Sequence, residues 1–290
     1  MDNKTKTEAI HLTLECIPCA INSLIKLFKN GFIEPDKQEA AMRVLLKFLS
    51  EIDFRKSPPE VAGDMHRLIR KIIDDNDPYF QVKQEFNTLM LKFYPELKRQ
   101  LEMAPDDYQL ALRLAIAGNV IDFGPNHNFN IEETLKTAHG VKLAVDHSAE
   151  LKAAVRNAER MLYIGDNAGE IVMDRILLET LNHPNVYFAV RGAPTLNDAT
   201  LDDAKQTGID KIATMLSTGD DSPGVVLDRV SEEFRRVFDT VDLIIAKGQG
   251  NYEGLCHYHK NIYFLLMAKC DHVAQHIGVR KGDFLLLRGK

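Results

Sequence analysis

The sequence lacks the long apolar stretches that would anchor a chain in a membrane or direct its export. Its first ten residues, MDNKTKTEAI, contain no apolar run of the signal-peptide kind, and no segment approaches ~18 consecutive apolar residues. Positive charge is also scarce, because 36 Lys and Arg stand against 42 Asp and Glu, a net charge of −6. Nucleic acids and anionic membranes attract a coherent excess of Lys and Arg. We therefore expect a cytoplasmic protein that binds neither nucleic acid nor membrane.

Cysteine is scarce as well, with four residues in a chain of 290. Four cysteines do not make a disulfide framework at this length, and the cytoplasm is reducing, so we expect thiols. Cys16 and Cys19 have a spacing that suits a metal or a dithiol, but one such pair is only half of a zinc site. Zinc binding, redox chemistry and simple packing all stay open. Partners for a zinc site would come from a His- and Cys-rich tract: Cys256, His257, His259, Cys270, His272 and His276.

The N-terminal part of the chain has a helical pattern. Apolar residues recur at three- and four-residue spacing from about Thr7 to Asn119, and clusters of Pro, Gly and acidic residues interrupt them. The pattern predicts about five helices, the last from Tyr108 to Ala117. We expect residues 1–118 to form a helical domain. The composition, 45% hydrophobic and 27% charged, is ordinary for a globular protein and leaves the oligomeric state open.

After Gly118 short apolar runs alternate with helical stretches. Continuous hydrophobicity is typical of strands that are buried on both faces, and helices between such strands imply crossovers in a parallel sheet. The pattern predicts an α/β fold, with a Rossmann-like three-layer α/β/α core and a mainly parallel sheet over residues 119–290, preceded by the all-helical domain. The predicted strands are 161–164, 186–190, 211–215, 243–246, 262–266 and 284–287.

Oxygen-bearing side chains follow the first two of these strands. Ligands of an open parallel sheet bind beyond the carboxyl ends of its strands. Asp166 and Asn167 come directly after one strand, and Asp198 ends the loop after the next. Hard divalent cations prefer such oxygens, and three ligands leave room for water and substrate. We expect a metal site at Asp166, Asn167 and Asp198; the alternative is that Asp166 or Asn167 only caps a helix.

Residues suited to an anion follow the other strands. Lys247 ends a strand within a glycine-rich segment, AKGQGN, where a phosphate can approach backbone N–H groups. Ser217, Thr218 and Gly219 follow a second strand, and Lys269 follows a third. A cation on one side and lysine on the other would offset the charge of a transferring phosphoryl group. A lysine in the position of Lys247, taken alone, is more often simply solvated.

Three segments together resemble a known family. They are residues 163–174 (YIGDNAGEIVMD), the pair Asn197 and Asp198, and residues 242–253 (DLIIAKGQGNYE). In this order they resemble the family first catalogued as domain of unknown function 89, whose members are called damage-control or metal-dependent phosphatases. The N-terminal ECIPC is similar to a microbial branch with Cys-x-x-Cys near its start. The resemblance runs from Cys16 to about Gly278.

The resemblance implies hydrolysis of a small phosphate ester, such as a sugar phosphate or a damaged cofactor- or nucleotide-type phosphate. It implies Mn, Co, Ni or Mg at the positions of Asp166, Asn167 and Asp198. Attack by water and a covalent intermediate on Asp166 both stay open, as does the physiological substrate. It further implies that Lys247 and Lys269 contact the phosphate, and we expect Lys247 to be catalytic beside the metal ligands. We expect Ser217, Thr218 and Gly219 to cradle the phosphate, and Asn251 and Glu170 to belong to the same site. Asn119 and Asp122 lie in a loop that resembles the branch's own pattern, where they either line the pocket or cap buried backbone groups.

Two other functions compete with the phosphatase. A transferase that binds S-adenosylmethionine or a nucleotide would use the loop at 165–169, but this loop lacks the full Gly-x-Gly-x-x-Gly pattern. A non-catalytic sensor of a phosphorylated metabolite would use the same residues without turnover. Phosphate release from a panel of esters distinguishes these functions.

Overall fold

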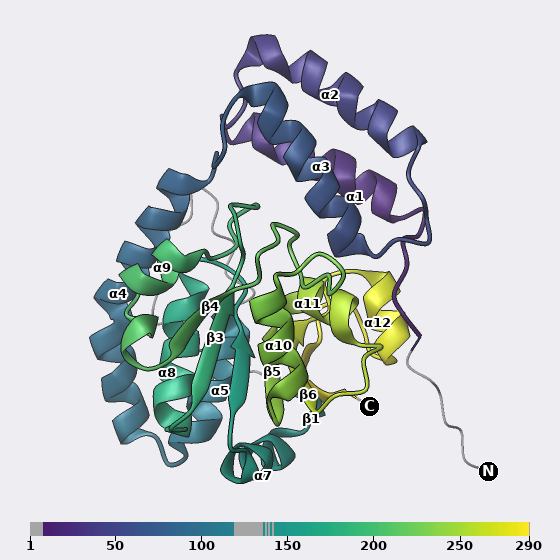
Figure 1. Ribbon diagram of the computed structural model, residues 1–290. Helices are drawn as coiled ribbons and strands as arrows, with labels where there is room; N and C mark the ends of the chain where they lie inside the picture. Colours follow the sequence, from purple (N-terminus) through teal and green to yellow (C-terminus); the bar gives the residue numbers. More distant parts are fainter. Residues whose placement is uncertain (1–7, 119–135, 137, 139, 141, 290) are drawn as a thin grey trace, which may run out of the picture.

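A computed structural model describes residues 8–118, 136, 138, 140 and 142–289. It shows a twisted sheet with helices on both faces, and three N-terminal helices that stand apart beyond one end of the sheet (Figure 1). The strands are β1 (Leu143–Asp146), β2 (Met161–Ile164), β3 (Val186–Val190), β4 (Thr214–Ser217), β5 (Leu243–Lys247), β6 (Ile262–Met267) and β7 (Phe284–Arg288).

The described helices are α1 (Cys16–Lys29), α2 (Pro35–Ser50), α3 (Pro58–Ile73), α4 (Phe80–Met103), α5 (Asp107–Gly118), α7 (Ser148–Asn157), α8 (Glu170–Leu181), α9 (Leu201–Gln206), α10 (Glu232–Thr240), α11 (Gly248–Leu255) and α12 (Asp271–Ile277). None of them is long and apolar enough to cross a membrane. The five helices predicted before residue 118 are confirmed. Pro35 and Pro58 open α2 and α3, because the first turn of a helix needs no N–H from its first residue.

The predicted fold class is also confirmed. The strand order is β1-β7-β6-β5-β2-β3-β4, and all neighbours are parallel except β6 and β7. The strand predicted at 211–215 begins later, at Thr214, because Ile209–Lys211 forms a 3₁₀ turn instead. Strand β1 was not predicted, since it lies at the sheet edge and its residues alternate between half-buried and exposed.

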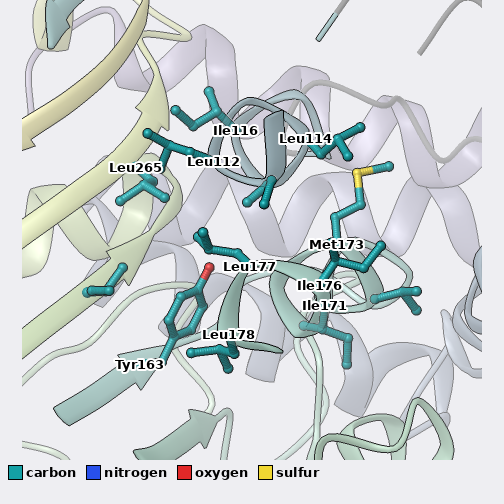
Figure 2. Packing of buried hydrophobic residues seen from close by; sticks show 14 of the residues in the cluster. Leu112, Leu114, Ile116, Tyr163, Ile171, Met173, Ile176, Leu177, Leu178 and Leu265 are labelled. Atoms are coloured by element: carbon teal, nitrogen blue, oxygen red, sulfur yellow. The ribbon is translucent and has the colours of Figure 1, made fainter. Parts of the chain in front are cut away.

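Each face of the sheet has its own hydrophobic core. Tyr163 packs under α5 and α8 on one face, whereas Leu162 and Ile164 pack under α10, α11 and α12 on the other. Figure 2 shows the first core, where residues of α5 and α8 meet Tyr163 of β2 and Leu265 of β6. Both faces are covered, which explains why the strands read as continuous apolar runs.

Helices α4 and α5 pack with the sheet rather than with the helices that precede them. Leu97 and Leu101 of α4 and most of α5 belong to the core that covers Tyr163. Helices α1 to α3 form a separate core around Leu24, Leu45 and Ile69. The domain division predicted at residue 118 stays a prediction, but the packing groups only α1 to α3 apart from the sheet.

The order of the strands creates one switch point. From β2 the chain moves outward to β3 and β4, and then returns to β5 on the opposite side of β2. Helices that leave β2 and β5 therefore run on opposite faces, and the carboxyl ends of these two strands are the place where such a sheet binds its ligands. The segments that contain Asp166 and Lys247 meet at this place.

Candidate active site

Asp166 lies directly at the switch point, after β2. Only 8% of the residue is exposed, and its Oδ2 lies against Gly248, the first residue of α11. Gly248 has φ +80°, and a Cβ at this position would overlap Oδ2 of Asp166. Glycine is therefore needed here for two reasons, the left-handed backbone and the close approach of a carboxylate.

The loops after β2 and β3 are joined, which brings the three predicted metal ligands together. Asn167 and Asp198 form an isolated antiparallel bridge. The backbone N–H of Ala168 donates to the carbonyl of Asn197 at 2.9 Å, and that of Ala199 donates to the carbonyl of Asp166 at 2.8 Å. Asp198 is 2% exposed and Asp166 is similarly buried. Two carboxylates and one carboxamide thus occupy one edge of the sheet.

Arg191 is a site residue that the sequence reasoning missed. It directly follows β3, and its side chain is 1% exposed. Its Nε donates to Oδ2 of Asp198 at 2.6 Å, Nη1 donates to Oδ1 of Asn251 at 3.1 Å, and Nη2 lies 3.6 Å from Oδ1 of Asp166. The guanidinium therefore links both aspartates. A basic residue directly after a continuous apolar strand was the available signal in the sequence.

The side chain of Lys247 points into the protein, toward α5 and α8. Its Nζ donates to Oε1 of Glu170 at 2.6 Å, to Oδ1 of Asp174 at 2.6 Å and to the carbonyl of Ala115 at 2.8 Å. None of its side chain is exposed. Tyr163 adds a hydrogen bond from its hydroxyl to Oδ1 of Asp174 at 2.7 Å. The structure places Lys247 in a buried ion cluster beneath the site.

Burial raises the pKa of the carboxyl groups in this region. The pKa of Asp198 is raised to about 7 by burial, against the lowering effect of Arg191. Burial also raises the pKa of Asp174 to about 7, although Lys247 lowers it. The pKa of Asp166 is raised by burial and by Glu170. Burial therefore outweighs the nearby positive charges at all three carboxyl groups.

Lys269 is an exposed cation near these carboxylates. It follows β6, and its backbone N–H donates to Oε1 of Gln249 at 2.8 Å. Its positive charge lowers the pKa of both Asp166 and Asp198, so the ammonium lies near them. In the described part of the chain no ion pair engages this ammonium. It remains available for a phosphate.

The other residues that were predicted to contact the phosphate make hydrogen bonds within the protein. Ser217 Oγ accepts from the N–H of Gly219 at 3.0 Å, and Thr218 Oγ1 donates to the carbonyl of Asp220 at 3.0 Å. Asn251 is fully buried, and its Nδ2 donates to the carbonyl of Lys247 at 2.7 Å. Their roles toward a ligand stay predictions. Asn119 and Asp122 lie outside the described residues.

The cysteines are all free thiols. Cys16 and Cys19 lie in the first turn of α1, and burial raises the pKa of Cys19. Gln249 donates to the sulfur of Cys270 at 3.5 Å. Within the described ranges no group of three or more His, Cys, Asp and Glu side chains is arranged to hold a metal. The zinc, redox and packing roles of the cysteines stay open predictions.

Buried carboxylates at the switch point of a Rossmann-like sheet are typical of an α/β enzyme. Comparisons with known proteins give the particular family. The family profile described as "Damage-control phosphatase ARMT1-like domain" matches residues 12–285. The chain is 36% identical over 282 residues to damage-control phosphatase PH1575 of Pyrococcus horikoshii, an alignment that covers 95% of this chain and 97% of the relative.

Further relatives agree with this match. A damage-control phosphatase of Archaeoglobus fulgidus is 34% identical over 249 residues, covering 83% of this chain and 86% of its own. An uncharacterized protein of Methanocaldococcus jannaschii, MJ0202, is 36% identical over 296 residues, covering 97% and 96%. The crystal structure of PH1575, described as a DUF89 family protein, superposes with a TM-score of 0.90 at 35% identity, and covers 97% of this chain and all of that one. The chain belongs to the damage-control phosphatase ARMT1-like family.

Proposed function

We propose that this protein is a metal-dependent phosphatase that hydrolyses a phosphate monoester of a small metabolite in the cytoplasm. Membership of the damage-control phosphatase family supports phosphatase activity. Two of the relatives carry that activity in their names. The net charge of −6 supports a small-molecule substrate rather than a nucleic acid or an anionic membrane, which attract basic surfaces.

The observation that supports a bound metal ion is a pair of buried carboxyl groups at the sheet edge. Asp166 is 8% exposed and Asp198 is 2% exposed. Among the described residues, the buried guanidinium of Arg191 lies beside both of them. Burying carboxylates without matching positive charge is costly, and a divalent cation between Asp166 and Asp198 would add such charge. The donor set therefore fits a hard divalent cation.

Asp166, Asn167 and Asp198 would hold this cation. A divalent ion held by these residues would supply Lewis-acid polarisation of a phosphoryl oxygen and activation of water. Arg191 holds Asp198 in place through its 2.6 Å hydrogen bond. Lys269 is free to bind the phosphate from the exposed side, which fixes the ester over the carboxylates. A carboxylate oxygen of Asp198 or Asp166 would orient the attacking water and accept its proton.

The deciding experiment measures inorganic phosphate released from a panel of sugar, nucleotide and cofactor phosphates. Mn, Co, Ni or Mg is added singly, after the protein is stripped with a chelator. We expect release that depends on the metal. Metal-dependent binding of an ester without release would instead identify a sensor, and metal-independent release would contradict the proposal.

Asp166→Asn tests the assignment of the site. The variant keeps the shape of the side chain but removes one charge from the cation ligands, and Asp166 lies in a loop at the sheet edge. We expect kcat/KM to fall by about 100-fold or more, with an unchanged circular dichroism spectrum. Unchanged hydrolysis would remove Asp166 from the site. Trapping an aspartyl-phosphate would overturn attack by water.

A further inference from the structure

The ammonium of Lys247 has no proton left for a substrate. An ammonium group has three N–H donors. The structure provides three acceptors, on Glu170, Asp174 and Ala115, at 2.6, 2.6 and 2.8 Å. The side chain is also completely buried. The lysine therefore acts on its carboxylate partners and not on a phosphate.

Glu170 carries this interaction to the site. Its Oε1 is held by Lys247, and its Oε2 accepts a hydrogen bond from Nδ2 of Asn167 at 3.0 Å. The side chain of Glu170 is fully buried at the first turn of α8. A carboxylate accepts hydrogen bonds on both oxygens, so one group satisfies the lysine and the amide together.

The carboxamide of Asn167 thereby acquires one orientation. Its Nδ2 faces Oε2 of Glu170 and also Oδ2 of Asp166, at 3.2 Å. A flipped carboxamide would turn its oxygen toward two carboxylate oxygens, which is electrostatically unfavourable. Both N–H donors of the amide are thus used, and the amide oxygen is the atom left for a cation.

We propose that Glu170, held by Lys247, is a positioning residue that orients the carboxamide of Asn167 for binding the divalent cation. The inference rests on the proposed metal-dependent function and deepens it. It replaces the direct phosphate contacts predicted for Glu170 and Lys247 with a role through Asn167. Partners that orient a metal ligand in this way change metal affinity by about 10- to 100-fold when they are removed.

Glu170→Gln tests the orientation, because a carboxamide accepts on only one of its two atoms. In that variant Lys247 takes the oxygen of the new carboxamide, whose nitrogen then faces Nδ2 of Asn167. Two donors that face each other favour a flipped Asn167. We expect the dissociation constant for Mn²⁺, measured by calorimetry on the full chain without substrate, to rise at least tenfold.

Asp174→Asn is the matched control. Asp174 is also a fully buried carboxylate on α8 and lies at the same 2.6 Å from Nζ of Lys247. Its Oδ1 contacts Lys247 and Tyr163, and its Oδ2 has no hydrogen-bond partner among the described residues. The control perturbs the buried ion cluster without touching Asn167. We expect its Mn²⁺ dissociation constant to stay within about threefold of the wild type.

The outcomes separate the inference from the function. If the wild type binds Mn²⁺ and Glu170→Gln binds it as well, or if both variants weaken binding equally, the positioning role is wrong while the metal site stands. The same measurement uses Co²⁺, Ni²⁺ or Mg²⁺ if the wild type binds no Mn²⁺. If it binds none of the four ions, the inference is wrong together with the metal requirement. Should Glu170→Gln fail to fold, Glu170→Asp serves instead, because it keeps the charge beside Lys247 but is too short to reach both partners.

Discussion

At the scale of single residues, Gly248 limits where the carboxylate of Asp166 can lie. A methyl group at Gly248 would overlap Oδ2 of Asp166. We expect Gly248→Ala to push the carboxylate aside and to weaken Mn²⁺ binding and kcat/KM by about tenfold or more. Calorimetry and steady-state kinetics measure the two effects.

Gly278→Ala is the control for this substitution. Gly278 has a similar left-handed backbone, φ +87° against +80°, but no heavy atom lies within 4 Å of a Cβ built there. The backbone strain alone, about 1 kcal/mol, should lower the stability of both variants. Equal Mn²⁺ affinity in the two variants would show that the overlap with Asp166 does not matter.

The sequence allowed three of the site residues to be placed but not the direction of Lys247. Asp166, Asn167 and Asp198 follow adjacent parallel strands, so topology alone brings them together. Lys247 is the last residue of β5, and side chains of a strand alternate between faces. Leu243 and Ile245 share its parity and pack toward α8. Because β5 is apolar on both faces, its sequence does not indicate that the side chain of Lys247 lies on the face covered by α8.

At the scale of elements, α3 is fastened to the loops around the site by charged side chains. Arg67 and Arg70 of α3 both donate to Asp221, in the loop after β4. Arg70 also donates to the carbonyl of Pro194, in the loop that leads to Asp198. Arg229, which lies between β4 and α10, forms an ion pair with Asp64 of α3, with 3.0 Å between Nη1 and Oδ1. This network connects the separate core of α1 to α3 with the sheet.

Asp221→Ala should loosen this connection. Two arginines lose a shared partner that is 8% exposed, and we expect the free energy of unfolding to fall by about 2 kcal/mol. Hydrogen exchange should accelerate in α3 and stay slow in β2. Glu39→Ala is the control, because its pair with Arg43 is 76–77% exposed and contributes about 0.5 kcal/mol or less. Equal losses in both variants would contradict the fastening role.

The elements themselves were largely predictable, for a physical reason. Strands buried on both faces and helices with regular apolar spacing have strong patterns, so β2, β3, β5, β6 and β7 were found at or near their bounds. An edge strand such as β1 has neither pattern. Ion pairs between distant segments, such as Arg67 with Asp221, leave no local signal, because 154 residues separate the partners.

At the scale of the whole molecule, the fold combines an acidic buried site with a helical layer that carries a buried histidine. The sheet is packed on both faces, and α1 to α3 stand beyond its end (Figure 1), where Arg70 of α3 contacts Pro194. Titratable side chains are therefore buried both in the sheet part, such as Asp198, and in α1 to α3, such as His66. The free energy of unfolding should consequently depend on pH through several groups, and the contribution of one of them can be measured separately.

His66 of α3 is that group. It is 4% exposed, and burial, with a smaller effect of Arg70, lowers its pKa from 6.5 to about 4. Between these values the unfolded chain binds a proton that the native protein does not, so stability is lost as the pH falls from 6.5 to 4. The loss attributable to His66 is about 3.5 kcal/mol at most, since one pKa unit corresponds to about 1.4 kcal/mol.

His66→Gln should remove this part of the pH dependence. Urea unfolding of the wild type and the variant at about pH 4.5, 5.5, 6.5 and 7.5 measures it, with exposed His259→Gln as the control. The difference in free energy of unfolding between wild type and His66→Gln should shift in favour of the variant as the pH falls, whatever the variant's stability at neutral pH. Parallel curves for the two proteins would show that His66 becomes protonated in the native state as readily as in the unfolded chain, and the acid sensitivity would then belong to other groups.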